Sequence, residues 1–145
     1  MTVHLVKMAV GIESVDHLID VQADRLQQAQ HGGVGVLRHL TRNTPRRAEE
    51  VLDGGSIYWI IKGYMRARQP ITSFGEAMGQ NGRPRCALIL DPKLVRTELV
   101  PHRPMQGWRY MEHAAAPKDL TRQAAAAKTA MPDEMEAELR ALGLL

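Results

Sequence analysis

Cysteine is scarce in this sequence of 145 residues: Cys86 is the only one, which excludes a disulfide framework. Long apolar runs are also missing, and without a stretch of about 18 apolar residues no membrane-spanning segment is expected. The first ten residues hold Lys7 inside an apolar stretch and lack a small-residue cleavage site, so no signal peptide is expected. These absences together predict a cytoplasmic protein without a membrane partner.

The motifs of common metal and cofactor sites are absent too. The six histidines have no paired ligand spacing and there is no Cys-x-x-Cys motif, so we expect them at the surface or in packing roles. Residues 31–35, His-Gly-Gly-Val-Gly, lack the Lys-Ser/Thr ending of a phosphate-binding loop. Cys86 lies in an apolar segment with Leu88 and Leu90, which favours a core residue over a nucleophile. The sequence therefore predicts no metal and no cofactor.

Charge is present and unevenly distributed. The formal net charge is +3, but it divides into −2 for residues 1–37, +7 for residues 38–110 and −2 for residues 111–145. The basic middle segment also contains all six aromatic residues: Tyr58, Trp59, Tyr64, Phe74, Trp108 and Tyr110. Arginine binds phosphate through two N–H groups and stacks on planar rings, and basic residues interleaved with aromatics are typical of single-stranded nucleic acid sites. The alternative is that arginine only keeps a small β-rich domain in solution.

The stretch from Asp53 to Arg68 organises the rest of the chain. Gly54 and Gly55 suit a sharp turn, and the β-branched and aromatic residues 56–61 predict a strand. Alternation places two sets of side chains on opposite faces, with a bulge allowed at Gly63. The inward, apolar set is Ile57, Trp59, Ile61, Met65 and Ala67, and the outward set is Tyr58, Ile60, Lys62, Tyr64, Arg66 and Arg68.

The elements around this stretch predict a small α+β domain. We expect a first strand over residues 3–10, a helix capped by Ser14 and ended near His31, and a short helix opened by Thr44-Pro45. Strands are expected at residues 34–40, 85–90, 94–100 and 106–110, with a hairpin at Asn81-Gly82. Short turns make the pairing antiparallel in the second half, so the predicted fold is a partly closed antiparallel β-barrel with an N-terminal helix and a short second helix. Residues 1–113 would form this domain, and residues 114–145 an alanine-rich linker and a terminal helix.

Several strings of the sequence resemble a known family. They are residues 45–63 (PRRAEEVLDGGSIYWIIKG), Arg85-Cys86, Leu90-Asp91-Pro92 and residues 106–110 (QGWRY). Together they are similar to the bacterial family called domain of unknown function 1489, from Met1 to about Leu120, and this resemblance implies no activity. The order of elements is also similar, at the level of fold, to PUA-like barrels, including the ASCH and EVE groups. That resemblance implies RNA binding, modified-base recognition and, in a few members, hydrolysis of an acylated nucleoside.

The main functional hypothesis is a nucleic-acid-binding surface, with RNA favoured as the partner. Arg46 and Arg47 lie at the start of a predicted helix, where cations oppose the helix dipole, so an anion would explain them. The alternative is that they are solvated or paired with Glu49 or Glu50. The residues assigned to the surface are Arg46, Arg47, Tyr58, Lys62, Tyr64, Arg66 and Arg68.

Two other functions remain open. In a small enzyme acting on a nucleoside-like ligand, Lys62 would have a lowered pKa in a dry pocket, with Glu98 or Asp91 as acid or base. In an interaction module, the terminal helix would use an apolar stripe of Met135, Leu139 and Leu142 to form a homodimer.

Overall fold

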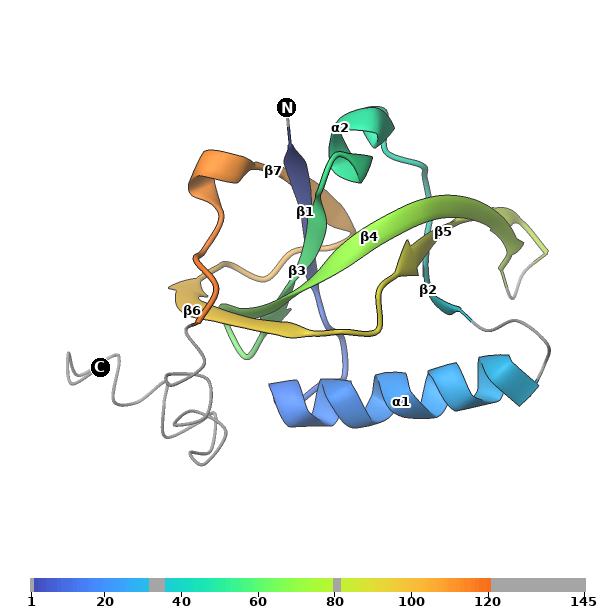
Figure 1. The fold of residues 1–145 in the computed structure, drawn as a ribbon, viewed down its shortest axis with the longest axis horizontal. Helices are drawn as coiled ribbons and strands as arrows, with labels where there is room; N and C mark the ends of the chain where they lie inside the picture. The colour runs from blue at the N-terminus through green and yellow to red at the C-terminus, as the bar shows by residue number, and fades with distance from the viewer. Residues whose placement is uncertain (1, 32–35, 80–81, 121–145) are drawn as a thin grey trace.

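The computed structural model describes residues 2–31, 36–79 and 82–120, which form an α+β fold (Figure 1). The strands are β1 (Val3–Met8), β2 (Leu37–Thr41), β3 (Ser56–Ile61), β4 (Tyr64–Met78), β5 (Pro84–Leu90), β6 (Val95–Pro101) and β7 (Trp108–Glu112). Helix α1 (Val15–His31) follows β1, α2 (Ala48–Leu52) precedes β3, and the 3-10 turn η1 (His113–Ala115) follows β7. The predicted mixed class is confirmed, and the predicted terminal helix lies outside the described residues.

The strands form an open sheet in the order β2-β5-β4-β3-β1-β7, with β6 paired to β4 beside this path. The expected closure into a barrel is not found among the described strands. The pairing is also not purely antiparallel, because β1 and β3 run parallel while the other pairs are antiparallel. Parallel neighbours need a long connection, and here the chain passes through α1, β2 and α2 between them.

Strand β4 joins the two parts of the sheet. Its first half pairs with β3 on one side and β6 on the other, and from Ile71 onward it pairs with β5. Pro70 lies where β4 changes its partner strand, a position at which the missing N–H of proline is tolerated. The Pro70 carbonyl accepts a hydrogen bond from the Asp91 amide at 3.0 Å. The change of partner lets one strand of 15 residues belong to both halves. Strands β4 and β5 are antiparallel neighbours, as the predicted hairpin requires, and Gly82 has a φ of 74°, while Asn81 lies outside the described residues.

The central stretch is a hairpin rather than one continuous strand. Lys62 and Gly63 have φ angles of 51° and 82°, the positive values that a two-residue type I′ turn requires at both central positions. Trp59 is opposite Ala67 and Ile60 is opposite Met65, so Arg66 is the extra residue of a bulge. This bulge moves Met65 away from the face on which alternation had placed it.

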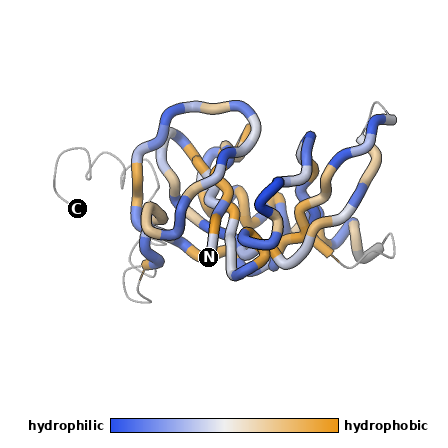
Figure 2. The backbone as a smooth tube through the Cα atoms, turned by 90° about the horizontal axis from the view of Figure 1, so that it is seen from above, coloured by the Kyte–Doolittle hydropathy of each residue, from blue (hydrophilic) through white to orange (hydrophobic). Residues whose placement is uncertain are grey.

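Both faces of the central strands are buried, and all six residues of β3 are covered. One face, covered by α1, packs Leu5, Ile57 and Trp59 against Val15 and Leu18 (Figure 1). The opposite face packs Val6, Tyr58, Ile60 and Met65 together. Figure 2 shows the hydrophobic stretches running through the middle of the molecule, with a hydrophilic tip on the β4–β5 hairpin. The face of β3 expected to meet solvent is therefore an interior surface.

The two helices begin at different kinds of residue. The predicted cap of α1 is confirmed, because the His17 amide donates to Ser14 Oγ at 3.0 Å. Helix α2 begins at Ala48, later than Thr44-Pro45 predicted, and Arg47 is its N-cap residue. The Arg47 amide is satisfied instead by the Tyr110 hydroxyl of β7 at 3.1 Å.

Candidate nucleic-acid interface

Three of the arginines predicted to contact nucleic acid are engaged within the fold. The Arg47 guanidinium donates to Glu50 and, at 3.0 Å, to Glu112, and it lies over the Tyr110 ring. Arg68 forms a two-pronged ion pair with Asp119 at 2.7 and 2.8 Å and also donates to Ser56 Oγ. Arg66 is buried and donates from Nε to the Ile61 carbonyl at 2.7 Å. The three guanidinium groups thus tie elements of the fold together.

The other predicted residues are spread over several environments. Tyr58 is buried, and burial raises the pKa of its hydroxyl. Lys62 is in the β3–β4 turn and pairs with Glu13 at 2.7 Å, while Arg46 is exposed before α2. The structure brings Tyr64 and Arg66 together, with the guanidinium 5.3 Å from the ring centre. It does not gather the whole predicted set on one open face.

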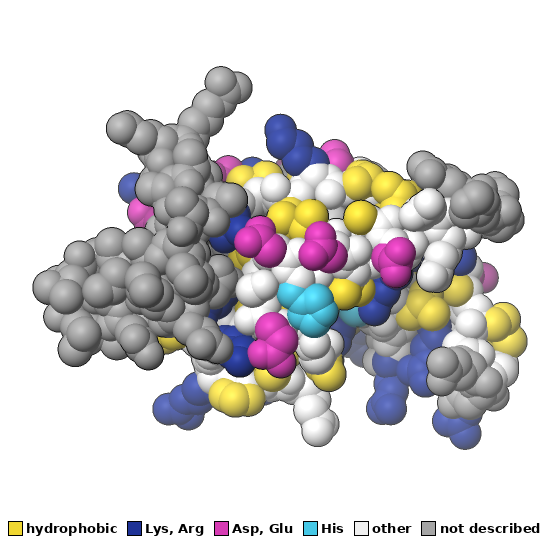
Figure 3. Space-filling model, turned by 90° about the horizontal axis from the view of Figure 1, so that it is seen from below, with side chains coloured by type: hydrophobic (Ala, Val, Ile, Leu, Met, Phe, Trp, Pro, Cys, Tyr) yellow, Lys and Arg dark blue, Asp and Glu magenta, His cyan; other side chains and the backbone are white. Residues whose placement is uncertain are grey.

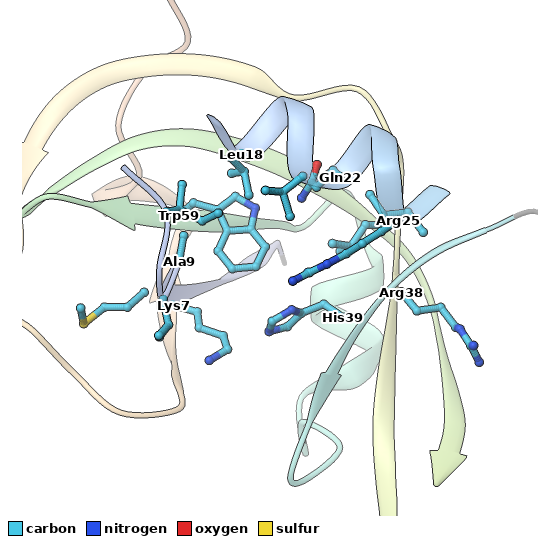
Figure 4. Close-up of a pocket in the computed structure, with 14 residues that line it drawn as sticks. Lys7, Ala9, Leu18, Gln22, Arg25, Arg38, His39 and Trp59 are labelled. Carbon is cyan, nitrogen blue, oxygen red and sulfur yellow. The ribbon is translucent and has the colours of Figure 1, made fainter. Parts of the chain in front are cut away.

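A row of rings and cations crosses the face of the sheet that α1 covers. In the strand registers, Lys7 of β1 lies between Trp59 of β3 and Trp108 of β7, so the three side chains share a face. His39 of β2 contacts Trp59 edge to face, with 5.1 Å between ring centres. Figure 4 shows Lys7, His39 and Arg25 of α1 directed into one space beneath the Trp59 ring. Four segments far apart in the sequence therefore meet here.

This space is the inner part of a longer concave surface. It is a cavity of about 210 Å³. An adjoining hollow of about 500 Å³ shares Lys7 with it, and another of about 520 Å³ shares Arg25 and Arg38. We call the whole surface the β2 groove, because β2 lines every part of it. Its cations are Lys7, Arg25, Arg38 and Arg42, and its rings are His39, Trp59 and Trp108.

The β2 groove is positively charged, and the described part of the chain contributes no carboxylate to its lining. None of its described lining residues is acidic, and within residues 2–31, 36–79 and 82–120 no ion pair involves its four cations. The exposed carboxylates of α1, Asp16, Asp20 and Asp24, belong to the outer face of the helix, where Figure 3 shows acidic side chains in a row. The groove thus presents cations, while the outer helix face carries negative charge.

Two titratable groups of the inner cavity, Lys7 and His39, have pKa values shifted toward their neutral forms. Burial lowers the pKa of Lys7 below its usual value. Burial and the nearby charges of Lys7 and Arg25 lower the pKa of His39 from 6.5 to about 4. Its Nε2 atom is also buried and makes no hydrogen bond to the part of the chain that the structure describes. A neutral imidazole with an unused nitrogen therefore faces two cations.

A buried amide network fixes the wall of this cavity. Gln69 and Gln22 exchange two hydrogen bonds at 2.8 and 2.9 Å, and Gln69 also accepts from the Trp59 indole N–H at 3.2 Å. The Gln69 amide donates further to the Asp91 carbonyl at 2.9 Å. These contacts hold the Trp59 ring at a set orientation and join α1 to β3 and β4.

Gln69→Leu is expected to lower the free energy of unfolding by about 3 kcal/mol. The substitution leaves the Gln22 amide and the Trp59 N–H without partners, and each buried unsatisfied group costs about 1–3 kcal/mol. Urea denaturation measures the change. The double variant Gln22→Leu/Gln69→Leu should lose less stability than Gln69→Leu alone. A loss of stability equal to the sum of the two single losses, or larger, would contradict the network.

Local sequence patterns give only weak signals for the residues that meet in the β2 groove. Lys7 is the one charge inside the first strand, and Trp108 is one of the six aromatic residues of the basic middle segment. His39 was assigned with the other histidines to packing or surface. Their meeting depends on strand registers between segments up to a hundred residues apart, and no local pattern encodes that.

Comparison with known proteins places the chain in a family of unknown function. Residues 5–145 match the model of the family described as Protein of unknown function (DUF1489), so the chain belongs to this family. The match runs through residues 121–145, beyond the point near Leu120 where we expected the resemblance to end. No curated protein and no solved structure matches the chain. Among the described residues, no helix is long and apolar enough to cross a membrane.

Proposed function

We propose that this protein binds single-stranded nucleic acid, with RNA favoured, in the β2 groove. The observation that carries the proposal is the row formed by Trp108, Lys7, Trp59 and His39, continued by three arginines without a described carboxylate among the lining residues. Cations neutralise phosphates, and a half-buried ring such as Trp108 stacks a base at about 1–3 kcal/mol. Of the residues first assigned from the sequence, Arg46 is exposed and contributes, whereas Lys62 is exposed but already paired with Glu13.

The distribution of ion pairs favours the β2 groove as the binding site, rather than the surface first predicted around Arg47 and Arg68. Arg47 and Arg68 already have carboxylate partners, so a phosphate would have to displace Glu50, Glu112 or Asp119. Within the described chain, the groove cations have no such competitor, and their mutual repulsion falls when a polyanion binds.

Removing two outer cations of the groove tests the proposal. Fluorescence anisotropy with a labelled single-stranded RNA should show roughly tenfold weaker binding for Arg38→Gln/Arg42→Gln at low salt. The slope of log K against log salt should become less steep by about 1.4, because each lost phosphate contact removes about 0.7.

The matched control removes two charges elsewhere. Lys93 and Lys118 are exposed and do not line the groove, so Lys93→Gln/Lys118→Gln should keep nearly the wild-type slope. Equal losses of affinity in the two double variants would show that the effect depends only on the net charge of the protein. Wild-type protein that binds no RNA or single-stranded DNA at low salt would end the proposal.

A further inference from the structure

The inner cavity has a feature that backbone binding along the groove does not require. Lys7, Arg25 and the His39 imidazole converge beneath Trp59, whereas Arg38 is directed away from them (Figure 4). The buried Nε2 atom of His39 lacks a partner in the described structure. A ligand with several acceptor oxygens and more than one negative charge would satisfy all three groups at once.

A nucleobase suits this cavity poorly. Only 3% of Trp59 is exposed and its N–H is already bonded to Gln69, so the ring offers little surface for stacking and no donor. An internal phosphodiester also suits it poorly, because it carries one charge and its chain must leave in two directions. A phosphate monoester carries a charge of about −1.5 to −2 and three acceptor oxygens, and it is a chain end.

We propose that the inner cavity, lined by Lys7, Arg25 and His39, binds a phosphate monoester. The monoester is the terminal phosphate of a strand lying in the groove or the phosphate of a free mononucleotide. The first source rests on the proposed function, and the second does not. The cavity volume of about 210 Å³ accommodates a phosphate group with part of its sugar.

Three RNAs of identical sequence distinguish these sources: one with a 5′-phosphate, one with a 3′-phosphate and one with two hydroxyl ends. Anisotropy should show at least about tenfold tighter binding for one phosphorylated RNA than for the unphosphorylated RNA. Calorimetry should show binding of adenosine 5′-monophosphate and none of adenosine.

Each outcome decides one of the two proposals. Equal affinity for all three RNAs, with no binding of the mononucleotide, overturns the monoester site and leaves nucleic-acid binding standing. Binding of the mononucleotide without any RNA supports the monoester site and removes the proposed function. If nothing binds, both fall.

Substitutions locate the monoester within the groove. Lys7→Met should abolish the preference for the phosphorylated RNA. Arg42→Gln, which lies outside the inner cavity, should weaken the binding of all three RNAs and preserve the ratio of their affinities. A wild-type measurement avoids dependence on folding of the variant: the ring ¹⁵N signals of His39, assigned by their loss in His39→Gln, should shift with adenosine 5′-monophosphate and not with adenosine. Unchanged signals would overturn the assignment of His39.

Discussion

Gly55→Ala is expected to lower the free energy of unfolding by more than about 3 kcal/mol. A Cβ atom at this position would lie 2.2 Å from the Val51 carbonyl oxygen and 2.4 Å from that of Val3. Both are backbone atoms, so relief requires α2 or β1 to move. Backbone hydrogen bonds also hold Gly55 in place. Its amide donates to the Val51 carbonyl, and its carbonyl accepts from the Ile71 amide. Urea denaturation followed by circular dichroism measures the loss.

Gly75→Ala is the matched control for this prediction. Its added Cβ would meet Ala87 Cβ at 3.9 Å, an ordinary contact, and the strand conformation there suits alanine. It should change stability by less than about 1 kcal/mol. Similar midpoints for the two variants would contradict the close approach of α2, β1 and β3 at Gly55.

Stability should fall steeply between pH 6.5 and about pH 4. The folded-state pKa values of His4 and His39 are lowered from 6.5 to about 4, in each case mainly by burial. The unfolded chain therefore binds more protons in this window, and unfolding becomes easier as pH decreases through it. Above pH 6.5 the full stability is present, and below about pH 4 these two groups cause no further loss. His4 contributes on the order of 3 kcal/mol, and the half-buried His39 contributes less.

The hydrogen bonds of His4 explain why its charged form is disfavoured. Nδ1 accepts the Ser56 amide at 3.0 Å, so the single proton of the neutral ring is on Nε2, which donates to His113 Nδ1 at 2.9 Å. A second proton would break the bond to Ser56 and repel Arg68. Unfolding by urea at pH 4.5 and pH 7 gives the difference. His4→Gln should flatten the pH dependence markedly, and an unchanged profile would assign the acid sensitivity to other groups.

Local signals predicted the local structure well. Ser14 caps α1, residues 56–61 form a strand, and β4 and β5 pair antiparallel as the predicted hairpin requires, because each feature depends on a few neighbouring residues. The alternation of Ile57, Trp59 and Ile61 onto one core face was also correct. The family assignment rested on such contiguous strings and is confirmed.

Features set by pairing between distant segments could not be predicted from the sequence. The Lys62-Gly63 turn and the Arg66 bulge redirect the side chains that follow, and a one-residue shift reverses every later face. The parallel pairing of β1 with β3 buried the Tyr58 face, which the alternating pattern had left outside. The partner of Arg68 is Asp119, 51 positions away, so the sequence showed an arginine and not its ion pair.

The claim on which this account depends is that nucleic acid binds in the β2 groove, and chemical-shift mapping tests it most directly. A ¹⁵N-labelled protein titrated with a single-stranded RNA bearing the preferred terminal phosphate should show its largest changes at Lys7, His39, Arg42 and the Trp108 indole. Changes concentrated instead at Tyr64, Arg66 and Arg68, or none at a concentration that saturates binding, would contradict it.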